Sequence, residues 1–184
     1  VNKYKLLYIK KKTNNGPAIN RNYALNYVKS NYTLFLDDDI SLISYNTFQS
    51  INDLIRQDNI AQYAFKIVNY DDETVLTDCG IWNYNGLFHG GILRGINTLA
   101  AHGLDSYTRK VMGGCTAATF VNNNVIKNVG GFDGDLYYLG EDTDLSLKII
   151  NSGYDVIYRP DIIFKHVESM SMDKRPELKK YLYY

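Results

Sequence analysis

The order of apolar and polar positions along the chain alternates between strand-like and helix-like patterns. Continuous apolar runs predict strands at 4–9, 32–36, 60–68 and 111–121, and two shorter ones at 154–158 and 162–164 around Pro160. Helices are expected at 17–30, 46–56 and 141–152. The run at 32–36 is continuous, which is typical of a strand buried on both faces. Alternation of this kind predicts an α/β sandwich with a mainly parallel sheet.

The connecting segments have their own signals. The acidic stretch 71–73 predicts a hairpin turn, and Asn122 or Asn123 is expected to cap a short helix that ends at Gly130-Gly131. The stretch 79–105 is interpreted as a long loop with a short helix, and long loops in compact domains often carry function. The tail from Asp173 is expected to be a surface helix, so the chain divides into a main domain, 1–170, and a tail, 171–184.

Composition narrows the classes that remain. The chain has 184 residues, of which 45% are apolar, enough for one domain with a buried core. Twenty basic and 20 acidic residues give no net charge, which argues against general binding of nucleic acid. Two cysteines, Cys79 and Cys115, are too few for a disulfide scaffold, so a cytoplasmic location is the default expectation. We expect no signal peptide, and no apolar run approaches the ~20 residues that cross a bilayer.

Three acids follow the expected strand 32–36 directly: Asp37, Asp38 and Asp39. In open α/β sheets, ligands bind beyond the carboxyl ends of the strands. Adjacent carboxylates repel one another, and a divalent cation such as Mg²⁺ or Mn²⁺ relieves that repulsion. In an extended chain Asp37 and Asp39 would point the same way and could share one site. An ordinary acidic loop explains the triplet equally well at this stage.

A second acidic cluster opens the expected helix 141–152. Its sequence is Gly140-Glu141-Asp142-Thr143-Asp144. Acids are common in a first helical turn because the helix dipole favours them there. If one carboxylate points into a cleft, it could take a proton from a hydroxyl as a general base. Asp142 is the first candidate for that base, with Glu141 beside it.

Together these motifs resemble family 2 glycosyltransferases. The shared elements, in order, are Asn15-Gly16 followed by Asn20-Arg21-Asn22, Leu34-Phe35-Leu36-Asp37-Asp38-Asp39, Gly113-Gly114-Cys115 leading to Val129-Gly130-Gly131-Phe132-Asp133, Gly140-Glu141-Asp142-x-Asp144-Leu145, and then Gly153-Tyr154, Pro160 and His166. The similarity runs from about residue 4 to about residue 170. Each motif is weak alone, but five in the right order are specific.

The resemblance implies a GT-A fold, a Rossmann-like α/β/α sandwich, and inverting sugar transfer from a nucleotide-sugar donor. It implies a Mn²⁺ or Mg²⁺ site at Asp39 with Asp37 and His166, and a base at Asp142 with Glu141. Donor-binding positions would be Asn15, Gly16, Arg21, Asp37 and Asp38, with Arg21 near the nucleotide or its diphosphate. Acceptor-binding positions would be Trp82, Gly114 and Glu141. His89 and His102 match no motif and are expected to be structural or loop residues.

Some alternatives stay open from the sequence. Family members normally begin with a strand, a helix and a second strand, so we expect the first strands to be missing here, which could favour self-association through an exposed edge. The acceptor could be a sugar, a lipid-linked sugar or another hydroxyl compound, with a bacterial surface polysaccharide as the product and with peripheral contact at the inner face of the membrane. The rival classes are a non-catalytic fragment that binds a sugar or a partner, and a metal-dependent nucleotidyl- or phosphoryl-transfer enzyme.

Overall fold

The structure is a computed structural model of the chain that describes residues 5–44, 46–56, 59–84, 87–89, 105–137 and 140–167. The strands of the main sheet are β1 (Tyr32–Leu36), β2 (Ile40–Leu42), β3 (Ile60–Asn69), β4 (Leu76–Asp78), β7 (Arg109–Lys110), β8 (Ala118–Asn122) and β9 (Asp155–His166). A separate hairpin is formed by β5 (Trp82–Tyr84) and β6 (Leu87–His89). The helices are α1 (Gly16–Leu25), α2 (Thr47–Asp53) with a following 3₁₀ turn (Leu54–Arg56), α4 (Asn123–Asn128) and α5 (Glu141–Asn151).

The main sheet is mixed, and its strands follow the order β1-β8-β3-β9-β2. The described part of the sheet has one parallel pair, β3 with β9, while β8 runs antiparallel to both β1 and β3. The expected α/β class is therefore confirmed, but the expected predominance of parallel pairs is wrong for these strands. Strands β1, β3 and β9 do share one direction, as strand–helix alternation implies. The difference arises because β8 is inserted between β1 and β3 in the opposite direction.

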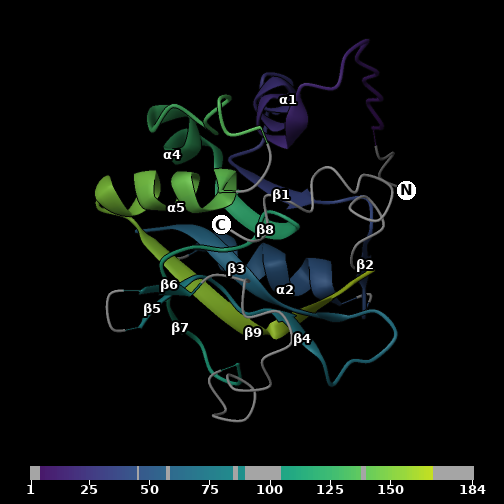
Figure 1. Cartoon of the computed structure of the whole chain (residues 1–184), viewed down its shortest axis with the longest axis vertical. Coiled ribbons are helices and arrows are strands. Elements are labelled where there is room, and N and C mark those ends of the chain that lie inside the picture. The colour runs from purple at the N-terminus through teal and green to yellow at the C-terminus, as the bar shows by residue number, and fades with distance from the viewer. Residues whose placement is uncertain are drawn as a thin grey trace.

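Helices cover both faces of this sheet, which gives three layers (Figure 1). One apolar cluster joins the sheet to α1, α4 and α5, with Leu25, Ile126 and Ile149 almost fully buried. A second cluster joins the sheet to α2 and its 3₁₀ turn, with Ile51 and Leu54 buried against Phe164. Burial of each large apolar side chain contributes about 1.5–3 kcal/mol. The first cluster therefore fixes α1 and α5, the elements that carry the polar motifs, on one face of the sheet.

Several elements differ from their predicted bounds. Residues 5–9 form no strand, and Leu6, Leu7 and Tyr8 are exposed, because the described residues offer this run no partner strand. Strand β8 begins only at Ala118, and residues 111–117 approach it as an irregular segment. The two short strands around Pro160 are one strand, β9, whose pairing with β3 shifts register between Arg159 and Ile163. A bulge accommodates Pro160 because its nitrogen cannot donate to the ladder.

The ends of β1 and α1 also differ from the predictions. Helix α1 ends at Leu25, several residues before the expected Ser30. In β1 only Phe35 is fully buried and Leu36 is 42% exposed, so this strand is not buried on both faces. It pairs with β8 on one side and ends the strand order of the described sheet, which explains the exposure. Among the described residues no helix is long and apolar enough to cross a membrane.

Candidate functional site

The acid triplet forms a turn directly after β1. The Asp37 N–H donates to Ala117 O at 3.0 Å, and the Ile40 N–H donates to Asp37 O at 3.2 Å. This second bond closes a turn, so the alternation of an extended chain does not apply to Asp37 and Asp39. Asp38 is exposed, and the other two acids are partly buried. The triplet therefore sends Asp37 and Asp39 to different partners.

Asp39 lies beside His166, as the metal assignment requires. Asp39 Oδ1 lies 3.2 Å from His166 Nε2, and the side chains are 20% and 14% exposed. The backbone holds them in register, because Ile40 pairs with His166 in the β2–β9 ladder and the Val167 N–H donates to Asp39 O at 3.1 Å. Residues more than 120 positions apart are thus brought together at the end of β9. A carboxylate oxygen and an imidazole nitrogen form a donor pair that suits Mn²⁺.

The second acidic cluster opens helix α5. Gly140 precedes the helix with φ 91°, and its carbonyl accepts the Asp144 N–H at 2.9 Å. Asp142 is partly buried, and its Oδ1 accepts the Thr143 N–H at 2.7 Å. Burial raises the pKa of Asp142, and the hydrogen bonds from Thr143 and the charge of Arg21 oppose that rise. A carboxylate in this state is a stronger base than an ordinary aspartate.

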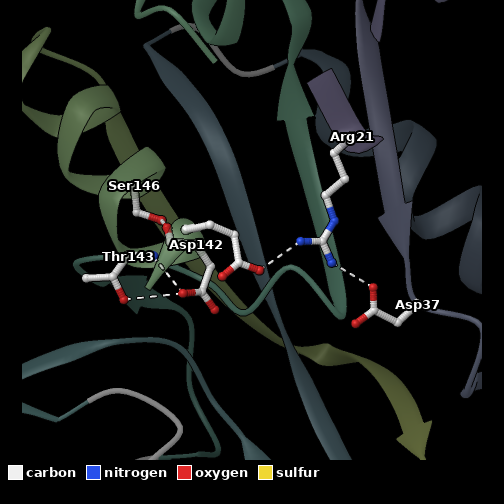
Figure 2. A network of polar contacts seen from close by, with 6 residues as sticks. Arg21, Asp37, Asp142, Thr143 and Ser146 are labelled. Atoms are coloured by element: carbon white, nitrogen blue, oxygen red, sulfur yellow. Dashed lines mark hydrogen bonds and ion pairs between the residues drawn. The ribbon is translucent and has the colours of Figure 1, made fainter. Parts of the chain in front are cut away.

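Arg21 of α1 joins the two acidic clusters. Its Nη2 donates to Asp37 Oδ1 at 2.7 Å, and its Nη1 donates to Glu141 Oε1 at 3.0 Å (Figure 2). Glu141 is buried, with a side chain 9% exposed. Burial raises the pKa of Glu141, the neighbouring Asp142 charge raises it further, and Arg21 opposes both effects. One guanidinium therefore holds the turn after β1 and the first turn of α5 together.

The chain fixes Arg21 itself through its neighbour. The Asn22 side chain donates to Phe132 O at 2.7 Å and accepts the Phe132 N–H at 2.9 Å. The guanidinium lies over the Phe132 ring, 5.6 Å from its centroid. Gly131 permits this contact, because a Cβ there would lie 2.6 Å from Asn22 Oδ1. The sequence motif includes Asn22 but predicts no role for it. Its position directly after Arg21 is the feature that could have indicated one.

A buried hydrogen-bond chain below α5 was also missed. The Ser146 hydroxyl contacts Asp142 O at 2.7 Å and Gln62 Oε1 at 2.9 Å, so it can donate to one of them at a time. Gln62 Nε2 then donates to Thr119 Oγ1 at 3.2 Å. All three side chains lie in the core, where unmatched polar groups are costly. When Ser146 donates to Gln62, these side chains link α5 to β3 and β8. No local sequence pattern marks such a chain.

Cys115 lies among the site acids. Burial raises the pKa of its thiol well above the ordinary range, and the charges of Asp78, Asp142 and Asp37 add to the effect. The thiol is therefore protonated and unreactive as a nucleophile at neutral pH. The Cys115 side chain is partly buried and packs against the second apolar cluster.

The remaining predicted residues lie at the start of α1, in the segment before β8, in the β5–β6 hairpin, or outside the described residues. Asn15 occupies the N-cap position of α1, but its side chain makes no cap bond, and Asn14 Oδ1 accepts the Gly16 N–H instead. Gly114 is buried, and a Cβ there would lie 2.7 Å from Ala64 Cβ, so the position needs a glycine for packing. The backbones of Trp82 and His89 pair in the β5–β6 hairpin, where the expected loop has strands. His102 and the tail helix from Asp173 lie outside the described residues.

Substitutions at Gly16 and Gly130 test the close contact between Gly16, at the start of α1, and the backbone of Tyr137. Both have positive φ, 81° and 87°. A Cβ at Gly16 would lie 2.4 Å from Tyr137 O, whereas a Cβ at Gly130 would meet nothing within 4 Å. Gly130→Ala should cost about 1 kcal/mol for the left-handed backbone alone, and Gly16→Ala should cost at least about 1 kcal/mol more, because backbone must move. Urea unfolding of both variants measures the difference; equal costs would contradict the close contact.

The residues at this end of the sheet supply only some of the ligands that a divalent metal needs. Among the described residues no group of three or more His, Cys, Asp and Glu side chains could hold a metal ion. Mg²⁺ and related ions, however, usually take one or two protein ligands together with substrate phosphates and water. Asp39 and His166 provide two donors that are partly exposed. The residues present therefore fit a metal that binds together with a phosphate-bearing ligand.

Comparison with solved structures identifies the fold. GalNAc-T7, solved with UDP, GalNAc and Mn²⁺, matches 86% of this chain with a TM-score of 0.61 and 15% identity. The mannosyltransferase PcManGT from Pyrobaculum calidifontis, solved with GDP-Man and Mn²⁺, matches 88% with a TM-score of 0.58 and 14% identity. The chain spans 31% and 39% of the length of these two proteins. The fold is thus the GT-A glycosyltransferase fold, as expected.

Comparison with sequences gives the family. No curated protein sequence matches the chain. The family model described as glycosyl transferase family 2 matches residues 1–112, which is more than half of the chain. That stretch contains Arg21 and the turn at Asp37–Asp39, and it ends before α5. The chain belongs to glycosyltransferase family 2.

Proposed function

We propose that this chain carries the catalytic site of a metal-dependent glycosyltransferase that uses a nucleotide-diphosphate sugar. The observation that carries the proposal is the Asp37–Arg21–Glu141 network, which brings a turn suited to a donor next to the base candidate Asp142. Family membership and the GT-A fold support it. UDP and GDP-Man, bound in the two similar structures, are the donor types to test first.

In this proposal the donor diphosphate lies at the turn after β1. Asp39 and His166 would hold Mn²⁺ or Mg²⁺, and Asp37 would assist them. The metal, when bound, would neutralise negative charge on the diphosphate. Asp38, which is exposed, and Asn15 and Gly16 at the start of α1 would contact the rest of the donor.

The chemical step would use Asp142. Its carboxylate takes the proton of an acceptor hydroxyl while the hydroxyl oxygen forms a bond to the anomeric carbon. The bond from that carbon to the diphosphate oxygen breaks, and the nucleoside diphosphate leaves with the electron pair. Attack from the face opposite the leaving group inverts the anomeric configuration. Glu141 supports this step through Arg21, since its carboxylate is 9% exposed and already accepts a hydrogen bond.

The acceptor side would lie near α5 and the β5–β6 hairpin. Trp82 is the proposed acceptor contact on that hairpin, and Gly114 keeps the floor of the site close-packed. We propose a sugar, lipid-linked or other hydroxyl acceptor in bacterial surface polysaccharide or glycoconjugate synthesis. The reaction would take place in the cytoplasm or at the inner face of the membrane.

A ligand screen tests the proposal. The full chain is heated with UDP, GDP, UDP-sugars or GDP-sugars, each with and without Mn²⁺, and the unfolding temperature is measured. A ligand present at about 100 times its Kd adds about 2.7 kcal/mol of stability. We expect one base to stabilise the chain only together with metal, and its sugar form to release nucleoside diphosphate. Stabilisation by none of the four, with no release of nucleoside diphosphate, would contradict donor use by this chain.

A further inference from the structure

Arg21 is held by two carboxylates and is largely buried. Both terminal nitrogens of its guanidinium donate to carboxylates, at 2.7 Å to Asp37 and at 3.0 Å to Glu141, and the side chain is only 12% exposed. These bonds use two of the five N–H groups of the guanidinium, and the low exposure of the side chain leaves little of it open to a ligand. A diphosphate that displaced the bond to Glu141 would leave that side chain, 9% exposed, without its counter-ion, which is costly for a buried charge. The contacts therefore point away from direct binding of the donor.

The same contacts span three segments that are far apart in sequence. Arg21 is 16 residues from Asp37 and 120 residues from Glu141. The double hydrogen bond of Asn22 to Phe132 and the ring under the guanidinium fix where Arg21 can reach. A planar guanidinium presents its N–H groups to the two carboxylates at fixed angles, whereas a Lys ammonium is a point charge on a flexible stem. Arg21 thus links α1 to the turn after β1 and to the start of α5. We call this linkage, formed by Arg21, Asp37 and Glu141, the strut.

We propose that Arg21 is a positioning residue that holds the first turn of α5 against the turn after β1, and so sets the base Asp142 relative to the bound donor. The inference rests on the proposed function for the role of Asp142, but the strut itself is a property of the chain without ligand. Ser146, one turn later in α5, lies within hydrogen-bond distance of the Asp142 carbonyl in the same helix and of Gln62 Oε1 in β3, and it donates to one of them at a time (Figure 2). When it donates to Gln62, it links α5 to β3 in addition to the link through Arg21.

The charges of Arg21 and Glu141 should change the pKa of Asp142, which can be measured. The groups that face Asp142 are Arg21 from α1, Glu141 and Thr143 from α5, and Cys115 from the segment before β8. Arg21 lowers the pKa of Asp142, and the Asp142 charge raises the pKa of Glu141, so the two carboxylates oppose each other's ionisation. Removing Arg21 should raise the pKa of Asp142, and removing the Glu141 charge should lower it. Removing both charges should leave the pKa of Asp142 near its wild-type value, because the two effects oppose each other.

The first test titrates Asp142 in the full chain without ligand. Carboxyl ¹³C chemical shifts are followed against pH in the wild type, Arg21→Gln, Arg21→Lys, Glu141→Gln and the double variant Arg21→Gln/Glu141→Gln, with Asp142→Asn for assignment. The pH at the midpoint of the Asp142 titration should be lowest in Glu141→Gln and highest in Arg21→Gln. The wild type and the double variant should lie together between these two. Arg21→Lys keeps the charge and should titrate near the wild type. The double variant also removes the unpaired Glu141 charge, so it should fold if Arg21→Gln does not.

The second test measures how firmly the first turn of α5 is held in place. In Arg21→Lys the amide protons of Thr143 and Asp144 should exchange faster than in the wild type, because a flexible ammonium holds the two carboxylates less rigidly than a planar guanidinium does. With the donor found in the screen, kcat should fall about 10- to 100-fold while the KM for donor changes less than about threefold. An unchanged Asp142 titration in Arg21→Gln, with UDP or GDP binding weakened tenfold or more, would overturn the strut and make Arg21 a donor ligand. If the wild type transfers no sugar, the titration and exchange results still decide the strut.

Discussion

Replacing Asp142 with asparagine should lower turnover about 10²- to 10⁴-fold, the usual contribution of a general base. The amide keeps an oxygen that can accept the Thr143 N–H, so the first turn of α5 should keep its geometry. Nucleotide binding with metal should therefore stay within about twofold of the wild type. Steady-state kinetics and a nucleotide titration of the same preparation check both parts. Undiminished transfer would remove Asp142 from the role of base.

Asp144 offers the matched control for that variant. It lies two residues later in the same first turn and forms an ion pair with Lys148 at 2.7 Å. Asp144→Asn removes one negative charge from the same helix end but leaves the Asp142 carboxylate in place. Since a partly exposed pair of this kind contributes at most about 1 kcal/mol, folding should survive. Turnover of Asp144→Asn should stay within about threefold of the wild type; an equal loss in both variants would mean that the helix charge, and not the base, matters.

The pH dependence follows from the sign of the same pKa shift. Because burial raises the pKa of Asp142, the base becomes protonated at a higher pH than an ordinary aspartate, and activity should fall correspondingly early on the acid side. The raised pKa also means that the ionised carboxylate destabilises the folded state. That penalty is absent below the unfolded-state pKa of about 3.9 and appears as the pH rises. Asp142→Asn should therefore unfold at an equal or higher temperature than the wild type at pH 7.

Local patterns predicted the elements that local physics decides. Asn122 caps α4 as expected, since its Oδ1 accepts the N–H groups of Asn124 and Val125. Strand β3 and helix α5 were also predicted within two residues of their observed ends, because an apolar run and an amphipathic period identify them. The acidic stretch 71–73 does connect the antiparallel strands β3 and β4. Each of these features depends on residues only a few positions apart.

Contacts between distant segments could not be predicted in the same way. Nothing in 118–122 indicates that β8 would enter the sheet between β1 and β3, because the pairing partner of a strand is set by the whole topology. The carboxylates of Asp37 and Asp39 were expected to face one site, yet the turn at 37–40 gives them separate partners, Arg21 and His166. The resemblance to the family named Arg21, but the ion pair to Glu141 joins residues 120 positions apart. Side-chain geometry of this kind appears only once the backbone is placed.

Asp39→Ala should abolish the metal-dependent part of nucleotide binding. Asp39 and His166 are the two donors that fit a metal at this end of β9, and removing the carboxylate leaves one nitrogen ligand. A neutral single ligand should hold Mn²⁺ far more weakly than the pair does. The stabilisation by nucleotide with Mn²⁺, about 2.7 kcal/mol at 100 times the Kd, should then fall to the value seen without metal. Thermal unfolding and direct Mn²⁺ binding followed by electron paramagnetic resonance measure this without any need for turnover.

Asp38→Asn serves as the control for charge at the same turn. Asp38 is exposed and neighbours Asp39 directly, so the two variants remove the same charge from adjacent positions. If the turn acts only through its total negative charge, both variants should weaken Mn²⁺ binding alike. If the Asp39–His166 pair holds the metal, Asp38→Asn should keep direct Mn²⁺ binding, whereas His166→Ala should lose it as Asp39→Ala does. Full stabilisation in both Asp39→Ala and His166→Ala would place the metal elsewhere, and the donor would then have to lie away from the end of β9.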